Sequence, residues 1–600
     1  MSNIRHLLTE HLDIWTAADT AAKSGRGRSA ANAAKVYGIS KLRELILELA
    51  VRGKLVPQDT SDEPASELLK RIQAEKAKLI AEGKIKKDKP LPLITNEDKS
   101  FDLPKGWAYS NLGDVVEIVR GITFPGSEKS KTPGKGRIAC LRTSNVQDQI
   151  EWSDILYIRE EFVSREDQIL MPRDIVMSMA NSRELVGKVA LVGKKIEQRT
   201  SFGGFLGVLR PFLIEPRFVM ALLRTPHTRE ALIDSASQTT NIANISLAKL
   251  RPLFFAIPPI EEQHRIVAKV DELMALCDQL ESEHNNASAA HEQLVNHLLG
   301  TLTESTSAED FSVSWQRIAA HFDTLFTTEA SIDALKQTLL QLAVMGKLVP
   351  QDPNDEPASE LLKKIRKEKD KLIAEGKIKK DKPLPPITNE EKPLTLPSGW
   401  EWAKLGELTS GMDSGWSPAC LDSCSSSDEV WGVLKTTSVQ VMQYLEYENK
   451  ELPSNLKPRP DAEVKVGDIL FTRAGPMNRV GISCLVQSTR PKLMISDKII
   501  RFHPIEIGIY GRFIALCLNA GATAEFLENA KSGMAASQVN ITQDRLRSAP
   551  IPITSLPEQH RIVAKVDELM ALCDQLKKQL LEVGAQQRKL ADVLVKNAVA

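Results

Sequence analysis

The sequence has no hydrophobic run of about 18 residues, the length that a membrane-spanning helix requires. Its first residues, MSNIRHLLTEHLD, include acidic side chains that secretory and transit peptides avoid. Cysteine is also scarce, with 7 scattered residues among 600, so a disulfide framework is not expected. These absences predict a cytoplasmic protein that makes no contact with a membrane.

An excess of charge of one sign is absent as well, because 78 basic residues balance 78 acidic ones. A protein that bound polyanions generally, through counterion release, would carry a strong positive excess. Any contact with nucleic acid must therefore be local or shared with partners. The apolar fraction of 42% is enough for ordinary cores, and 600 residues predict several domains.

Signatures of catalysis are missing too. The sequence contains no G-x-x-x-x-G-K-[ST] phosphate loop, no G-x-G-x-x-G after a strand, no NPPY-type loop and no H-E-x-x-H. Asp461 and Glu463 carry the letters of a PD…ExK nuclease centre, but they are too close in sequence to come from neighbouring strands. Cys420 and Cys424 have no second ligand pair. No catalytic residue and no metal site is predicted.

What the sequence does contain is a long duplication. The heptapeptide GKLVPQD occupies residues 53–59 and returns at 346–352. The block EQHRIVAKVDELMALCDQL occurs at 262–280 and again at 558–576. Because the first copy of this block leads into a segment that resembles the N-terminus, the repeat is circular.

The segments between these blocks, residues 105–258 and 398–553, are similar in length but differ in sequence. They contain short β-rich runs separated by Gly, Pro and charged turns, with a helix expected over 216–233. A stretch rich in Gly, Ser and Ala predicts a flexible insertion near residues 21–36. The fold class expected is α+β, with two similar mixed α/β domains in a pseudo-twofold circular repeat.

The two EQHRIV blocks carry apolar residues spaced alternately by four and three, the heptad pattern of a coiled coil. Two similar stripes predict two long helices that pair with each other. The alternative is that each stripe packs on its own neighbouring domain. The expected seam residues are Ile266, Val270, Leu273, Cys277, Leu280, Ile562, Val566, Leu569, Cys573 and Leu576.

Three motifs, each present twice, carry a resemblance to a known family. GW…LG opens each variable domain, D-I-(V/L)…G lies inside it, and N-I-(S/T) followed by prolines and EQHRIV closes it. Over nearly the whole chain this pattern resembles the specificity (S) subunit of a type I restriction-modification enzyme. The resemblance implies that the variable parts are target recognition domains and that the repeated helices pair antiparallel. The first conserved region is longer than the family pattern.

The resemblance implies six regions. They are a helical conserved region (1–100), target recognition domain 1 (101–258), a central coiled-coil helix (259–300), a second copy of the helical region with its linker (301–394), target recognition domain 2 (395–554) and a C-terminal coiled-coil helix (555–600). Two different domains on a pseudo-twofold frame could face two half-sites about 34 Å, one DNA turn, apart.

The function implied is that of a non-catalytic DNA specificity subunit, which binds a bipartite asymmetric double-stranded DNA target with one domain per half-site. It would scaffold two modification (methyltransferase) subunits and the restriction (endonuclease/translocase) subunits. S-adenosylmethionine, ATP and Mg would be bound by those partners, with no cofactor in this chain. Two alternatives stay open: a nuclease or methyltransferase with built-in specificity domains, and a scaffold that binds only proteins.

Candidate DNA-contacting residues are polar and basic side chains in matching segments of the two domains, because Arg reads guanine, Asn or Gln reads adenine, and Ser or Thr reads either. In the first domain they are Arg142, Thr143, Ser144, Asn145, Asn181, Ser182 and Arg183; in the second they are Lys435, Thr436, Thr437, Ser438, Arg473, Asn478 and Arg479. The alternative for each is a solvated loop residue or a phosphate contact.

Overall fold

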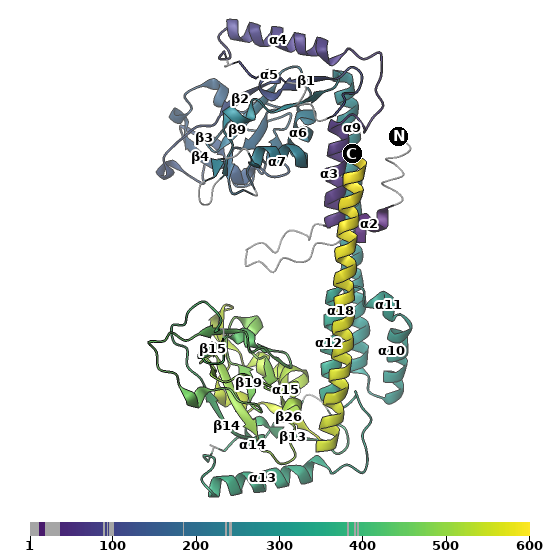
Figure 1. Ribbon diagram of the computed structural model, residues 1–600, viewed down its shortest axis with the longest axis vertical. Coiled ribbons are helices and arrows are strands. Elements are labelled where there is room, and N and C mark those ends of the chain that lie inside the picture. Colours follow the sequence, from purple (N-terminus) through teal and green to yellow (C-terminus); the bar gives the residue numbers. More distant parts are fainter. Residues whose placement is uncertain are drawn as a thin grey trace. The chain divides into compact units, whose positions relative to one another are not determined.

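The computed structural model describes most of the chain (Figure 1). The described residues are 11–17, 36–87, 90–92, 94, 101–183, 185–234, 237–238, 243–380, 383–388, 392, 395–425 and 427–599. Apart from Val36, the flexible insertion predicted near residues 21–36 lies outside them.

The chain forms two compact units. Unit 1 contains Met1–Ala287 and Val583–Ala600, and unit 2 contains Ser288–Glu582. The two points where the chain leaves one unit and enters the other fall inside two long helices, α9 (Ile260–Glu304) and α18 (Leu556–Val599). Each unit therefore combines a recognition domain with parts of both long helices.

The recognition domain of unit 1 contains three sheets and a closing strand pair. The four-stranded sheet has the order β2-β9-β5-β7, a mixed sheet has the order β4-β3-β8, and a small sheet has the order β10-β11-β6. The strands are β2 (Val116–Arg120), β3 (Arg137–Leu141), β4 (Leu156–Arg159), β5 (Ile175–Ser178), β6 (Ala180–Asn181), β7 (Val189–Leu191), β8 (Thr200–Phe202), β9 (Leu206–Pro211), β10 (Ser237–Gln238) and β11 (Ala243–Asn244).

Unit 2 repeats these three sheets and adds a two-stranded sheet, β16 (Val439–Gln440) with β17 (Gln443–Tyr444). Its sheets have the orders β14-β23-β19-β21, β18-β15-β22 and β20-β25-β24. The strands are β14 (Thr409–Ser414), β15 (Gly432–Leu434), β18 (Asn449–Glu451), β19 (Ile469–Thr472), β20 (Ala474–Gly475), β21 (Ser483–Leu485), β22 (Leu493–Met494), β23 (Ile499–Pro504), β24 (Ser532–Ala535) and β25 (Gln538–Asn540). The two mixed α/β domains expected from the sequence are confirmed.

Each recognition domain is closed by pairing of its first and last strands. β1 (Ala108–Asn111) runs antiparallel to β12 (Phe254–Ile257), and β13 (Glu401–Lys404) runs antiparallel to β26 (Pro550–Ile553). These pairs bring the chain back to its entry point directly before each long helix. All four strands lie within the predicted bounds 101–258 and 395–554, which remain predictions.

An inner strand of each large sheet separates two apolar clusters. In β5, Ile175 and Met177 pack into one cluster while Val176 packs into another. In β19, Ile469 and Phe471 face one cluster and Leu470 the other. Because successive side chains of a strand point to opposite faces, a continuous apolar strand is what a sheet covered on both sides requires.

The prediction of a single helix over 216–233 is wrong in one respect, because this range forms two helices. α6 (Pro216–Arg224) ends at Thr225, whose ψ is 144°, and α7 (Pro226–Asp234) begins at the next residue. Proline disfavours the helical conformation of the residue before it and donates no backbone hydrogen bond. In unit 2, α15 (Gly511–Asn519) and α16 (Gly521–Asn529) take the same places.

The long helices pack in a bundle with a third helix in each unit (Figure 1). In unit 1, one apolar cluster joins the first half of α9, the last part of α18 around Ala591, and α3 (Tyr37–Val51). In unit 2, another cluster joins the first half of α18, the second half of α9 around Leu299, and α12 (Glu329–Val344). Since the first half of each long helix meets the last part of the other, the two run antiparallel.

Most of the expected seam is buried, with Leu280, Leu569 and Leu576 half-buried. Its partners differ from the prediction that the two matching stripes face each other. Ile266 and Cys277 contact α3 and the end of α18, and burial raises the pKa of the Cys277 thiol to about 11. Ile562 and Val566 pack in the core of the recognition domain, and Cys573 packs in the bundle with α12. The heptad pattern shows that a face is buried without showing what covers it.

Two further helices with nearly the same sequence pack against the recognition domains: α4 (Ala65–Ala81) and α13 (Ala358–Ala374). Among the described residues, no helix is both long and apolar enough to cross a membrane.

Candidate nucleic-acid interface

The predicted DNA-contacting residues of the first segment form a short 3-10 turn after a strand of the mixed sheet. In unit 1 the turn is η2 (Thr143–Asn145), which follows β3. In unit 2 it is η6 (Thr436–Ser438), which follows β15. The turns occupy corresponding places in the two domains.

In unit 1, Asn145 holds the turn together from inside. It is 1% exposed, and its Nδ2 donates to the backbone oxygens of Glu151 (2.8 Å) and Asp154 (3.1 Å). Its Oδ1 accepts the backbone N–H of Arg142 at 2.9 Å. Asparagine commonly serves neighbouring backbone groups in this way. Asn145 therefore shapes the turn, while Ser144 is exposed and Thr143 half-buried.

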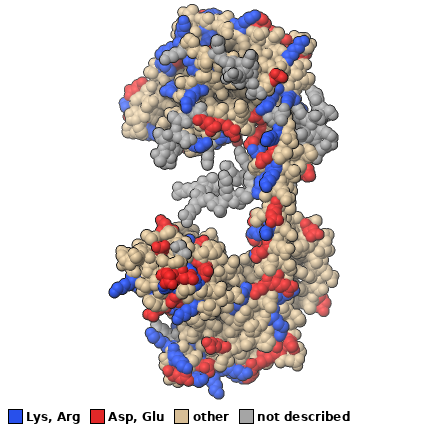
Figure 2. Space-filling view, viewed as in Figure 1, with Lys and Arg blue, Asp and Glu red and all other residues tan. Residues whose placement is uncertain are grey.

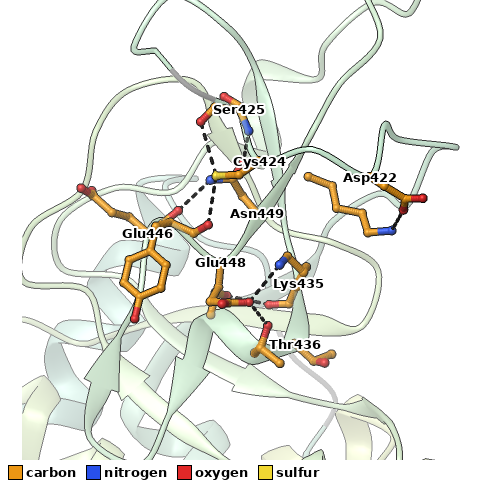
Figure 3. Close-up of polar contacts among 12 residues, drawn as sticks. Asp422, Cys424, Ser425, Lys435, Thr436, Glu446, Glu448 and Asn449 are labelled. Atoms are coloured by element: carbon orange, nitrogen blue, oxygen red, sulfur yellow. Dashed lines mark hydrogen bonds and ion pairs between the residues drawn. The ribbon is translucent and has the colours of Figure 1, made fainter. Parts of the chain in front are cut away.

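Arg142 and Lys435 occupy the same position of the turn, and each pairs with an acidic side chain of its own domain. The Arg142 guanidinium bonds the carboxylate of Asp154. The Lys435 ammonium donates to Glu448 Oε2 at 2.9 Å. Figure 3 shows Lys435 and Glu448 pointing toward one another. The positive charge of each turn is thus balanced locally.

Glu448 is the centre of a polar network in unit 2 (Figure 3). Its Oε2 also accepts the hydroxyl of Thr437 at 2.5 Å. The hydrogen bond from Thr437, and then that from Lys435, hold the pKa of Glu448 below its usual range, because both favour the ionised form. Ser438 is fully buried and donates to the backbone oxygen of Lys435 at 2.7 Å, which is the structural role that Asn145 has in unit 1.

The second predicted segment lies around the small sheet. In unit 1, Asn181 ends β6, and Ser182 follows it with its backbone oxygen accepting the N–H groups of Leu185 (3.0 Å) and Val186 (2.9 Å). Arg183 is exposed, and its guanidinium lies 3.7 Å from Asp234 of α7.

In unit 2, Arg473 precedes β20, and its backbone oxygen accepts the N–H of Ile541 at 2.8 Å. Asn478 and Arg479 lie in η8 (Met477–Arg479). Asn478 is exposed, whereas Arg479 is half-buried. Burial lowers the pKa of the Arg479 guanidinium.

The structure brings the two predicted segments together in unit 2. Arg479 Nη2 donates to the backbone oxygens of Thr436 and Val439, both at 2.8 Å. In unit 2 the turn and the segment after β20 are therefore hydrogen-bonded to each other. In unit 1 the connection is made by residues outside the predicted set, because Lys188 Nζ donates to Gln147 Oε1 at 3.0 Å. Arg183 contacts α7 and not the turn.

Sequence analysis missed the glutamines that link the two segments. Gln440 Oε1 accepts Arg479 Nη1 at 3.2 Å, and Gln147 accepts Lys188. Both glutamines end the matching heptapeptides LRTSNVQ and LKTTSVQ, so the repeated letter was a signal available in the sequence. A glutamine amide can contact adenine in the major groove.

A hollow of about 430 Å³ lies beside η8 in unit 2. Met477, Asn478, Val441 and Lys531 are among its lining residues. Val441 and Met477 are 40% and 47% exposed. Apolar side chains beside exposed amides suit the contacts that a base edge and a thymine methyl group offer.

The surface charge is mixed. Basic and acidic side chains are interspersed over the visible face of each unit in Figure 2. Chemically, the turns offer hydroxyl, amide and ion-paired basic groups, which suit selective hydrogen bonding better than general attraction of phosphate. Within the described ranges, no group of three or more His, Cys, Asp or Glu side chains could hold a metal ion.

Comparison with known proteins gives a consistent result. The family profile described as "Type I restriction modification DNA specificity domain" matches residues 104–288 and 439–583. The chain is 47% identical to the type I restriction enzyme EcoEI specificity subunit of Escherichia coli over 99% of this chain and 100% of that protein.

It is 38% identical to the Escherichia coli EcoAI specificity subunit, covering 100% of both chains. A chain from a solved structure on complex assembly and conformational transition of the type I R-M system aligns at 19% identity with a TM-score of 0.46, over 83% of this chain and 99% of that one.

Proposed function

Because the chain belongs to the family of type I restriction-modification specificity subunits, we propose that it selects the DNA sequence on which its complex acts. Each recognition domain binds one half of a bipartite, asymmetric double-stranded DNA target. The observation that carries the proposal is that the two domains share the same three sheets but differ in the side chains of the matching turns. Arg142 and Lys435 occupy the same position of the turn, as do Ser144 and Thr437, but each pair consists of different residues.

The chain acts as a non-catalytic scaffold that assembles with modification and restriction subunits. The pseudo-twofold repeat of the bundle and of α4 and α13 favours two copies of the modification subunit, since a duplicated surface suits two identical partners. Methyl transfer and ATP-dependent cleavage then take place in the partners, which bind S-adenosylmethionine, ATP and Mg. The complex works in the prokaryotic cytoplasm.

Sequencing the methylated adenines of host DNA with and without this chain tests the proposal. A bipartite motif that disappears with the chain is the expected result. Methylation by the purified chain alone would instead favour a catalytic protein, and the absence of any motif that depends on the chain would favour a scaffold that binds only proteins.

Exchange of residues 105–258 for the matching block of a relative tests the division of labour. Only one half of the methylated motif should change, because the two domains have separate cores. The reciprocal exchange of residues 398–553 is the matched control and should change the other half. If one exchange altered both halves, the domains would not read independently.

A further inference from the structure

We infer that a buried Trp–Glu contact at the root of each recognition domain fixes the orientation of that domain on its long helix, and so determines how strictly the complex selects the number of base pairs between the two half-sites. The residues are Trp107 with Glu262 in unit 1 and Trp400 with Glu558 in unit 2. They are positioning residues, and the inference rests on the proposed function.

The tryptophan opens the recognition domain and the glutamate lies in the first turn of the long helix. Trp107 Nε1 donates to Glu262 Oε2 at 3.0 Å, and Trp400 Nε1 donates to Glu558 at 3.2 and 3.3 Å. Glu262 is 1% exposed and Glu558 is 3% exposed. A buried carboxylate that loses a donor is left with an unsatisfied hydrogen-bond acceptor, so each contact favours one geometry.

Each glutamate has a second donor, and the two copies supply it differently. Gln58 Nε2 donates to Glu262 Oε1 at 3.2 Å, whereas the hydroxyl of Thr554 donates to Glu558. Prolines replace the Thr554–Ser555 pair in unit 1. The same contact is thus built twice from different neighbours, which is what a shared geometric requirement predicts.

The glutamine after each glutamate ties the helix to a second loop of the domain. Gln263 Oε1 accepts the backbone N–H of Glu215 at 3.0 Å, and its Nε2 donates to the oxygen of Pro258 at 2.9 Å. Gln559 Oε1 accepts the N–H of Tyr510 at 2.9 Å. Both glutamines are fully buried. The domain is therefore held at two separate places, which restricts rotation about either one.

The repeated heptapeptide GKLVPQD completes this junction. A Cβ atom on Gly53 would lie 2.5 Å from Pro104 Cγ and 3.0 Å from Trp107 Cζ2, and one on Gly346 would meet Pro397 and Trp400 at 2.7 and 3.1 Å. Both glycines have positive φ angles, 68° and 69°. The glycine of the repeated segment is thus required by packing against the tryptophan, independently of any partner subunit.

An ion pair beside the junction recurs as well. Arg265 donates to Asp62 at 2.6 Å, and Arg561 donates to Asp355 at 2.7 Å. None of the predicted DNA-contacting side chains belongs to either junction. Loosening a junction should therefore leave the preferred half-site sequences unchanged while it widens the range of separations that the complex accepts.

The test replaces Trp107 and Trp400 by Phe, singly and together, in the full chain assembled with its partner subunits. Phenylalanine keeps an aromatic ring in the core and removes the N–H donor. We expect methylation at spacers one base pair longer or shorter to rise on the order of tenfold relative to the native spacer, with the largest rise in the double variant. Trp315→Phe, an exposed tryptophan of α10 (Ala308–Ala320), is the control and should change nothing.

An unchanged spacer distribution in the Phe variants would overturn the inference, and so would a change in either half-site sequence. If Trp107→Phe does not assemble, Gln58→Ala removes the second donor to Glu262, together with the hydrogen bond from Gln58 to the backbone oxygen of Gly53 in the same junction, and provides the same comparison. Failure of the proposed function would differ from both outcomes, because the wild-type chain would then direct no bipartite methylation.

Discussion

At the scale of single residues, the two domains place strained backbone at different positions. Arg173 and Leu213 have φ angles of 71° and 52°. The corresponding residues of unit 2 are Gly467 and Gly508, with φ angles of 93° and 73°. A side chain in this region costs roughly 1–2 kcal/mol. Unit 1 carries this cost at these two positions, whereas unit 2 carries it at Met442 and Lys492, with φ angles of 61° and 60°.

Matched substitutions at one of these positions should have opposite effects. Gly508→Ala should destabilise the protein by about 1–3 kcal/mol, because its Cβ would lie 2.0 Å from Leu361 Cδ1 and its φ is positive. Leu213→Gly should leave stability unchanged or raise it by up to about 1 kcal/mol, since Leu213 is 51% exposed. Thermal unfolding of the assembled complex measures both. A stabilising Gly508→Ala would contradict this account.

The exposed Asn478 and the half-buried Arg479 should separate direct reading from support. Arg479→Ala removes hydrogen bonds to the backbone oxygens of Thr436 and Val439, so it should lower stability by about 2 kcal/mol. Asn478→Ala should stay within about 0.5 kcal/mol of wild type. Both substitutions should lower methylation of the native target. With Asn478→Ala, the relative methylation of DNA targets that carry base changes should shift only when those changes lie in the half-site of domain 2. If Asn478→Ala changed methylation of all altered targets equally, Asn478 would not contribute to base recognition.

At the scale of helices and strands, the sequence predicted the long helices well because their heptad pattern is local. It could not predict that Ile562 and Val566 would contact the recognition domain, since a buried stripe does not identify its partner. The strand order of the sheets was also out of reach, because strands such as β3 and β8 pair across about sixty residues of intervening sequence.

The candidate site shows the same limit. Motif alignment found both turns, but it treated Asn145 and Ser438 as readers although both are buried and bond the backbone of their own turn. Polar residues in a turn can hydrogen-bond either their own backbone or a ligand, and the sequence alone does not distinguish these roles. Burial of the side chain does. Whether the exposed members of the set contact DNA stays a prediction.

An insertion in α9 should change the spacer. Four residues added between Leu280 and Leu294 lengthen the helix by about 6 Å and rotate it by about 40° beyond a full turn. We expect the half-sites to move apart by about one or two base pairs of 3.4 Å each, with unchanged half-site sequences and some loss of affinity. The methylated motif in cells that lack the wild-type chain gives the measurement. Full activity with the native spacer would mean that other connections set the separation.

At the scale of the whole molecule, balanced charge should make DNA binding depend on partners. The 78 basic and 78 acidic residues provide little general attraction to phosphate. The isolated chain should therefore bind its target weakly, and addition of modification subunits should raise the affinity by several orders of magnitude. Binding assays at a fixed salt concentration measure this difference. Nanomolar selective binding by the chain alone would contradict it.

The circular repeat also imposes an order on synthesis. Unit 2 is one continuous stretch, Ser288–Glu582, whereas unit 1 needs Val583–Ala600 to supply Ala591 and Leu594 to its helical bundle. A ribosome makes those residues after everything else in both units. Unit 1, whose synthesis begins first, is thus completed last. Until the last turns of α18 have been made, the apolar face of α3 and of the start of α9 that packs against them stays exposed. Nascent chains interrupted within α18 are the ones that chaperones and proteases can recognise by that face.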